Sequence, residues 1–348
     1  MRRWIVVIVA VLQIGVLAYM AGEREWILRT GEPVFVRTAP IDPRDPMRGD
    51  YVRLEYEVST VPRALCAEGL QDMFTEANRY RRVHRDRRVY AVLTRGEGGV
   101  AGIEALTDRE PAGGLYMRGR IQSVDVDSVN VRYGIEALFT EQGAARRFED
   151  EVRGAKAGVP VNAQVALSRR GVAVLSGYRW EPLGITCVLR RAEQPADPAR
   201  RDVRGVIGAT VTLKNHSDAP VAIVDLPGAG SFRLVAVNRW AGETHVPVSR
   251  RTPGMPQAAD VVLLQPGQSH EVELDFTTPD WFVQAVAREG APAEPPQALE
   301  ALAGQWSAWF RIEYLPPPAA ACAGLPHAEA IRHAPLRTRS FGAAGGID

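Results

Sequence analysis

A long and almost entirely hydrophobic run lies near the start of the chain. Residues 4–21 carry no charge and directly follow Arg2 and Arg3. A helix over these residues would be about 27 Å long, close to the ~30 Å hydrocarbon core of a bilayer. We therefore expect residues 1–29 to form a membrane anchor, with residues 4–21 crossing a bacterial inner membrane. The alternative is a cleaved signal peptide, but residues 18–21 lack the paired small residues that its cleavage site requires.

The charges around this run predict its orientation. Arg2 and Arg3 favour the cytoplasmic side of the membrane, because positively charged flanks are retained there. The N-terminus is therefore expected in the cytoplasm and the bulk of the chain in the periplasm. No second apolar run of this length follows, so the sequence predicts a single-pass protein.

Alternation of hydrophobic and polar residues begins after the anchor and predicts strands. The first strand is expected over 33–39. The second is expected over 50–58, where every second residue from Val52 to Val58 is apolar and the strand would pair back on the first. Residues 30–189 are therefore read as a β-rich α+β domain. Its other expected elements are strands over 88–94, 100–106, 115–124, 128–133, 159–167 and 172–178, and a short helix over 143–156.

A different pattern follows residue 189. Residues 190–203 are polar, contain two prolines and are expected to be a linker. Short strands then recur between turns, which is typical of an immunoglobulin-like β-sandwich, here over 204–318. The Ala-, Pro- and Gly-rich residues 319–348 are predicted to be a loose tail. The strands expected in the sandwich are 206–214, 221–224, 232–237, 261–264, 270–276 and 306–314. The expected fold class is mainly β: an N-terminal transmembrane helix, a β-rich α+β domain and an immunoglobulin-like β-sandwich.

Charge and cysteine content narrow the function classes. The chain has 42 Lys+Arg and 41 Asp+Glu, a net charge of +1, so no general attraction to nucleic acid is expected. The histidines and cysteines have no metal-ligand spacing, and we expect no metal and no cofactor. Outside the cytoplasm one pair among Cys66, Cys187 and Cys322 could oxidise, and their spacing leaves the pairing open.

The most specific motif in the chain is Gly49-Asp-Tyr-Val-Arg-Leu-Glu-Tyr56. It matches, at every defined letter, the pattern that names the GDYXXLXY family of bacterial proteins, and residues 42–48 resemble that family's lead-in. Residues 132–143 resemble a second family motif, with Leu138 where an aromatic residue is usual. The resemblance covers roughly residues 1–180. It implies an N-terminal membrane segment, a multi-pass membrane protein as partner, and no established activity.

The hairpin that carries the motif also carries the candidate functional residues. Leu54 and Tyr56 are expected in the core and Gly49 in a turn, so structure alone accounts for much of the motif. Asp42, Asp45, Asp50 and Glu55 could also hold a cation or act as acid and base. Tyr51 is expected on the polar face, close to the second motif. The candidate functional surface comprises Asp42, Asp45, Gly49, Asp50, Tyr51, Arg53, Glu55, Tyr133 and Glu136.

These features favour a non-catalytic protein. The sequence contains no nucleophile elbow, phosphate-binding loop or zinc-protease motif. We expect a membrane-anchored envelope accessory or binding protein that works with a membrane-protein partner. The alternatives are an envelope hydrolase, or a calcium-dependent binding module that uses the hairpin carboxylates.

Overall fold

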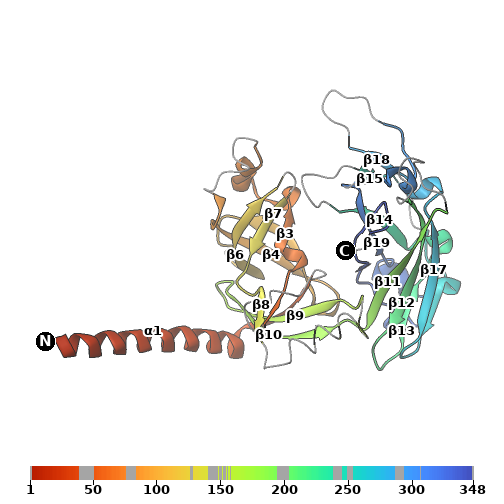
Figure 1. The fold of residues 1–348 in the computed structure, drawn as a ribbon. Helices are drawn as coiled ribbons and strands as arrows, with labels where there is room; N and C mark the ends of the chain where they lie inside the picture. Colours follow the sequence, from red (N-terminus) through yellow and green to blue (C-terminus); the bar gives the residue numbers. More distant parts are fainter. Residues whose placement is uncertain are drawn as a thin grey trace. The chain divides into compact units, whose positions relative to one another are not determined.

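The computed structural model is mainly β, as the sequence predicts, and its chain divides into two units (Figure 1). The first unit comprises Met1–Ala145 and Val161–Arg179, and the second comprises Arg146–Pro160 and Trp180–Asp348. The structure describes residues 2–38, 51–75, 84–125, 128–139, 148, 151, 154, 156, 158–193, 204–237, 245–248, 254–286, 294–305 and 307–346.

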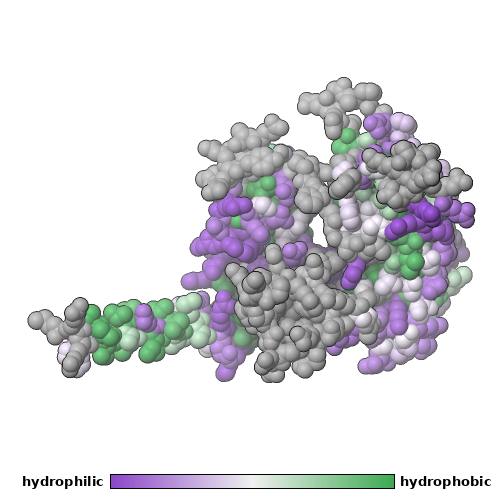
Figure 2. Space-filling view, viewed as in Figure 1, coloured by the Kyte–Doolittle hydropathy of each residue, from purple (hydrophilic) through white to green (hydrophobic). Residues whose placement is uncertain are grey.

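The chain begins with one continuous helix, α1 (Arg2–Thr30). Its segment Trp4–Thr30 is long and apolar enough to cross a membrane, with a mean hydropathy of 2.4. Large apolar side chains such as Trp4 and Leu17 are exposed along it, and Figure 2 shows this hydrophobic surface. A helix whose apolar side chains are exposed all round is suited to lipid, which is consistent with a single membrane anchor.

Two main antiparallel sheets build the first unit, in agreement with the strands predicted there. One sheet has the order β3-β7-β6-β4-β5, and the other has the order β1-β9-β10. The strands are β1 (Glu32–Arg37), β3 (Thr60–Pro62), β4 (Arg88–Arg95), β5 (Ala101–Thr107), β6 (Tyr116–Val124), β7 (Ser128–Arg132), β9 (Val161–Leu167) and β10 (Ala173–Trp180). Short 3-10 turns follow β3 at Arg63–Leu65 and Glu68–Phe74.

The predicted strand over 50–58 is wrong in its length and in its partner. Strand β2 covers only Tyr51–Arg53 and pairs with β8 (Ala137–Phe139). Residues Glu57–Ser59 form a 3-10 turn, in which the Ser59 N–H donates to the Tyr56 carbonyl oxygen at 2.9 Å. This turn removes the backbone from the ladder, and among the described residues a single bridge, between Tyr56 and Thr38, lies beyond the end of β1. The predicted inward face is correct at Leu54, Tyr56 and Val58, which are all buried.

The second unit contains antiparallel sheets around one main apolar core. The two larger sheets are β11-β12-β17 and β14-β19-β20, with β21 also paired to β19. Buried residues from both of them, among them Val211 and Phe310, belong to one hydrophobic cluster. This arrangement is compatible with the expected β-sandwich. Its strands are β11 (Leu183–Arg191), β12 (Val206–Asn215), β13 (Val221–Val224), β14 (Phe232–Ala236), β15 (His245–Pro247), β16 (Val261–Leu264), β17 (Ser269–Asp275), β18 (Val283–Ala285), β19 (Trp309–Tyr314), β20 (Leu336–Arg337) and β21 (Phe341–Gly342).

The boundary between the units lies before the predicted linker. Strand β11 runs across the expected boundary at residue 189 and pairs with β12 of the second unit. The sequence pattern missed it because charged residues end this strand and continue into the polar segment. Of the predicted helix over 143–156, the structure places Phe148 and Glu151 in helical conformation, and most of the others lie outside the described residues. Phe148 stacks on Trp180 with ring centroids 5.4 Å apart, both in the second unit.

The predicted loose tail is also wrong. Residues 319–346 include helix α4 (Ala319–Cys322) and the strands β20 and β21, which pair with β19. Phe341 is fully buried in the main core of the second unit. Small residues dominate this segment, but its few large apolar side chains point inward, and they stabilise it as part of the unit.

All three cysteines are free thiols. Cys66 lies in the first unit, and Cys187 and Cys322 lie in the second. Burial raises the pKa of Cys66 to about 11, so this thiol stays protonated and unreactive at neutral pH.

Candidate functional site

The two sequence motifs lie next to each other in the first unit. Strand β2 of the first motif pairs with β8 of the second, with Tyr51 opposite Phe139 and Arg53 opposite Ala137. The contact continues beyond the strands, because the Leu54 N–H donates to the Glu136 carbonyl oxygen at 2.8 Å. The expectation that the two motifs meet in space is confirmed at the level of the backbone.

Two tyrosines fasten the motifs to each other, and we call Tyr56 and Tyr133 the tyrosine pair. The Tyr56 hydroxyl donates to the Ile135 carbonyl oxygen at 2.6 Å. In the opposite direction, the Tyr133 hydroxyl donates to the Val58 carbonyl oxygen at 2.8 Å. Tyr56 therefore satisfies a carbonyl group inside the second motif, and Tyr133 satisfies one just beyond the first. Such bonds matter most where water is excluded, since a buried unpaired carbonyl is costly.

The tyrosine pair does not titrate in the physiological range. Burial, and to a smaller extent the charge of Glu136, raise the pKa of both phenols above their ordinary value of 10.0. Both hydroxyls therefore remain protonated donors. Their role is to hold the two motifs together, and Tyr133 is a buried residue instead of the surface residue that the sequence predicts.

Glu136 shapes the loop that precedes β8. Its carboxylate accepts hydrogen bonds from the backbone N–H groups of Tyr133, at 2.5 Å, and of Gly134, at 2.9 Å. Gly134 has a φ of +83°, which a side chain would disfavour, and the carboxylate stabilises this turn from inside. The same carboxylate lines a neighbouring hollow, so Glu136 both supports the loop and contributes charge to a surface.

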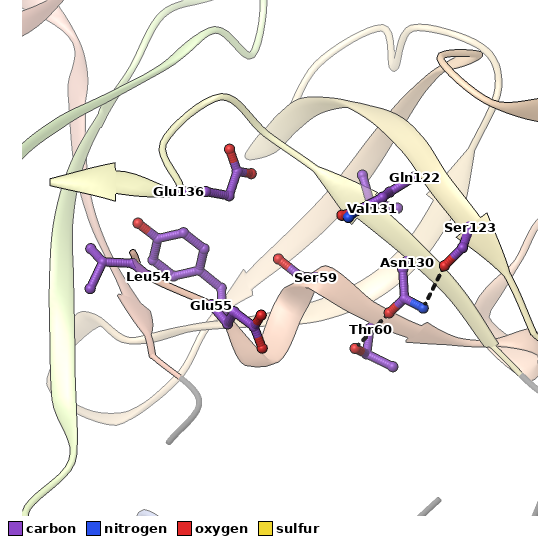
Figure 3. Close-up of a pocket in the computed structure, with 10 residues that line it drawn as sticks. Leu54, Glu55, Ser59, Thr60, Gln122, Ser123, Asn130, Val131 and Glu136 are labelled. Carbon is purple, nitrogen blue, oxygen red and sulfur yellow. Dashed lines mark hydrogen bonds between the residues drawn. The ribbon is translucent and has the colours of Figure 1, made fainter. Parts of the chain in front are cut away.

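That hollow, which we call the motif pocket, has a volume of about 230 Å³ (Figure 3). Polar groups form most of its wall. On one side the Thr60 hydroxyl donates to Asn130 Oδ1 at 3.0 Å, and Asn130 Nδ2 donates to Ser123 Oγ at 3.0 Å. Glu55 and Glu136 add two carboxylates. The pocket is lined by Leu54, Glu55, Tyr56, Ser59, Thr60, Gln122, Ser123, Asn130, Val131 and Glu136.

The structure brings part of the predicted surface together. Glu55 and Glu136 line the motif pocket, and the Glu55 side chain is exposed. Tyr51 and Arg53 are placed by their backbone in β2, while their side chains lie outside the description. The expected position of the Tyr51 side chain therefore stays a prediction. Four further predicted residues fall outside the described residues: Asp42, Asp45, Gly49 and Asp50.

The sequence did not reveal the polar residues that strands β6 and β7 contribute to the wall of the motif pocket. Asn130 sits in the middle of β7, between the buried residues Val129 and Val131. Asparagine is depleted in strands, so an asparagine at the centre of an alternating run could have indicated a functional position here. Ser123 and Gln122 lie at the register shift between β6 and β7, which the sequence pattern does not reveal.

The motif pocket offers hydrogen bonds and negative charge. Its wall combines carboxylates, hydroxyls and amides, and its described lining residues include no histidine or cysteine. Within the described ranges, no group of three or more His, Cys, Asp and Glu side chains could hold a metal ion. The cation or acid–base use of the hairpin carboxylates rests mainly on Asp42, Asp45 and Asp50, which lie outside those ranges.

The comparison with known families agrees with the motifs. Residues 13–177 match the model of a family described as GDYXXLXY protein. These residues belong to the GDYXXLXY family. The matched segment begins inside α1 and ends within β10, so the GDYXXLXY segment contains both motifs and the motif pocket. No curated protein and no solved structure matches the chain.

Proposed function

We propose that the protein is a non-catalytic accessory or binding protein of the bacterial envelope, anchored in the inner membrane and bound to a membrane-protein partner. The motif pocket carries this proposal. It lies where both family motifs meet, it is open and polar, and it belongs to the unit that bears the anchor helix. A binding role needs only such a surface, whereas catalysis needs an activated group within reach of a substrate.

The chemistry of the pocket favours a basic, hydrogen-bonding ligand group. Glu55 and Glu136 supply negative charge, and Asn130 and Thr60 supply donors and acceptors. An arginine or lysine side chain from an exposed loop of the partner satisfies both requirements, because charged groups form the stronger hydrogen bonds with carboxylates. We therefore expect the partner to present a basic residue at this pocket.

We further propose that α1 crosses the membrane once, with its N-terminus in the cytoplasm and both units in the periplasm. Arg2 and Arg3 precede the apolar span, which is the arrangement that the positive-inside rule favours. Protease added to intact spheroplasts should then digest both units. Protection of both units in sealed spheroplasts would reverse this orientation.

Site-directed photo-crosslinking tests the binding role. A photoreactive residue replaces Gln122, which is exposed and lines the motif pocket. Irradiation of cells should yield one specific adduct with a membrane protein. The matched control places the same residue at Glu104, an exposed position on β5 that does not line the pocket, and should yield no such adduct.

Charge-neutral variants complete this test. Glu55→Gln and Glu136→Gln should each reduce the adduct several-fold, because they remove the charge that attracts the basic group. An undiminished adduct in both variants would contradict the proposed ligand chemistry. A monomer without any adduct, combined with a measurable hydrolytic turnover that these variants abolish, would favour the hydrolase alternative instead.

A further inference from the structure

The anchor helix joins the first unit without a linker. Helix α1 ends at Thr30 and β1 begins at Glu32, so only Gly31 separates them. The Gly31 N–H donates to the Ile27 carbonyl oxygen at 2.7 Å. A Cβ at Gly31 would lie 2.5 Å from that oxygen and 3.0 Å from the Leu167 carbonyl oxygen, so only glycine fits this close approach.

The end of the helix is also docked by side chains. Ile27 is only 4% exposed, whereas its neighbour Trp26 is 69% exposed. Ile27 packs in one apolar cluster with Ala166 of β9 and Val174 of β10. These two residues flank the turn between the strands, Ser168–Gly171, so this turn, which we call the β9–β10 turn, lies beside the last turns of the helix.

Helix length places this turn at the membrane surface. The span Trp4–Thr30 contains 27 residues, and its length of about 40 Å matches a bilayer including both headgroup layers. The docked end of the helix therefore lies at headgroup level when α1 spans the membrane. Strand β9 runs towards the helix end, because Leu167 pairs with Glu32, and so its turn lies on the side of the docked helix end.

The β9–β10 turn is rigid. The Gly171 N–H donates to the Ser168 carbonyl oxygen at 2.9 Å, and the Arg118 N–H donates to the Gly171 carbonyl oxygen at 2.7 Å. Gly171 has a φ of +69°, and a Cβ there would lie 2.7 Å from the Tyr116 ring. The Tyr116 hydroxyl bonds to the Arg169 carbonyl oxygen at 2.9 Å. The turn thus holds its backbone in one shape against β6.

The side chains of this turn are cationic. Arg169 and Arg170 are both exposed, and neither forms an ion pair with any other residue that the structure describes. Other charges near the helix end are largely paired, since Arg29 bonds to Glu25 and Arg95 bonds to Glu32. Glu110 bonds to the Tyr116 hydroxyl at 3.0 Å, and Arg118 lies near the same hydroxyl. Together with Arg169 and Arg170, these two residues carry a net positive charge.

We propose that the β9–β10 turn is a second membrane contact, at which Arg169 and Arg170 bind the phosphates of anionic phospholipids. Guanidinium groups bind phosphate oxygens through paired N–H donors, and basic residues at the membrane surface are attracted to anionic lipids. The occupant is a lipid headgroup because the turn lies at headgroup level, beside a helix that anchors it there. The proposal is independent of the motif pocket and of its ligand.

Lipid selectivity of the full-length chain tests this contact. The protein is reconstituted in nanodiscs that contain equal amounts of phosphatidylglycerol and phosphatidylcholine, and native mass spectrometry measures the ratio of the two lipids retained after release. We expect R169Q/R170Q to lower this ratio by about 25-fold at low ionic strength, since each of the two surface arginines contributes about a fivefold preference. R169K/R170K keeps the charge and should retain most of the preference for phosphatidylglycerol.

A matched control separates this contact from overall charge. Arg85 and Arg88 are exposed arginines of the same unit, and Arg88 begins β4, whose other end, Arg95, pairs with Glu32 near the membrane helix. R85Q/R88Q removes the same charge and should leave the lipid ratio unchanged. Wild-type selectivity in R169Q/R170Q, or an equal loss in R85Q/R88Q, would overturn the proposal. Thermal melting of each variant verifies that the fold is retained.

Discussion

The two units bury their polar groups in different ways. In the first unit, the tyrosine pair joins the two motifs through hydrogen bonds that span 79 and 75 residues of the chain. The motif pocket opens beside this pair. In the second unit, Glu313 is 1% exposed and its carboxylate is bonded by Arg337 at 2.7 Å and by Arg233. The first arrangement leaves polar groups available to a ligand, whereas the second satisfies its carboxylate internally. The polar groups of the first unit are therefore the ones that the proposed binding role uses, whereas the ion pairs of Glu313 stabilise the second unit.

The largest expected effect comes from shortening the second unit. A chain that ends at Pro335 lacks β20, β21 and the buried side chain of Phe341. Loss of one buried phenylalanine alone costs about 3–5 kcal/mol, against a typical domain stability of about 5–15 kcal/mol. Limited proteolysis should show rapid digestion of the second unit and survival of the first. Equal resistance in the shortened and full-length chains would mean that these residues are dispensable.

Truncation of Tyr56 should destabilise the first unit. Tyr56 is 2% exposed, so Tyr56→Ala should lower the free energy of unfolding by about 3–5 kcal/mol through the cavity it leaves. Tyr56→Phe keeps the ring and loses only the bond to the Ile135 carbonyl oxygen, so its expected cost is about 1–2 kcal/mol. Urea denaturation of both variants provides the measurement. If the two variants were equally unstable, the hydroxyl bond and not the packing of the ring would supply most of the stabilisation by Tyr56.

Acid should weaken the ion pairs of Glu313 in the second unit and leave the tyrosine pair of the first unit unchanged. Burial alone would raise the pKa of Glu313, but hydrogen bonds and charges from Arg337 and Arg233 lower this pKa below its ordinary value of 4.5. The stabilisation is therefore fully present above pH 4.5 and is lost as the pH falls towards the lowered pKa. Melting temperatures of the wild type and Glu313→Gln should converge in acid. The difference between the wild type and Tyr56→Phe should stay constant over the same range, because that phenol remains protonated.

The smallest effect on stability is expected at the rim of the motif pocket. Gln122 is exposed, so Gln122→Ala should change the free energy of unfolding by less than about 0.5 kcal/mol. It should still weaken partner binding a few-fold, because the ligand loses a hydrogen-bonding amide at the pocket wall. Co-purification of the partner with each variant measures this effect. A destabilised variant would instead indicate that Gln122 supports the sheet.

Strands in which hydrophobic and polar residues alternate clearly were predictable from the sequence. Strands without a clear hydrophobic pattern were not. β4 to β7 and β12 to β14 appear where apolar residues alternate or cluster. β11 ends in charged residues, and β20 and β21 are short and surrounded by Ala, Pro and Gly. Their pairing depends on contacts with distant strands, such as β19, which local composition does not encode.

The candidate site was predictable in position and only partly in content. The two motifs indicate where it lies, and Glu55 and Glu136 were identified in advance. The inward orientation of Tyr133 was missed because it depends on the Val58 carbonyl oxygen, which the unpredicted 3-10 turn presents. Asn130 and Ser123 reach the pocket through the register of β6 and β7, and register is a property of the folded sheet.

The reciprocal bonds of Tyr56 and Tyr133 also join segments that are far apart in the chain. They close loops of 79 and 75 residues, and the Thr38 hydroxyl bond to Val161 closes one of 123. Contacts of such long sequence separation form slowly, since each requires a large loop to close first. In a chain that emerges N-terminus first, the helix can enter the bilayer long before β8 and β9 leave the ribosome. The first motif is therefore synthesised before the strands that it contacts, and its bonds to them cannot form until those strands follow.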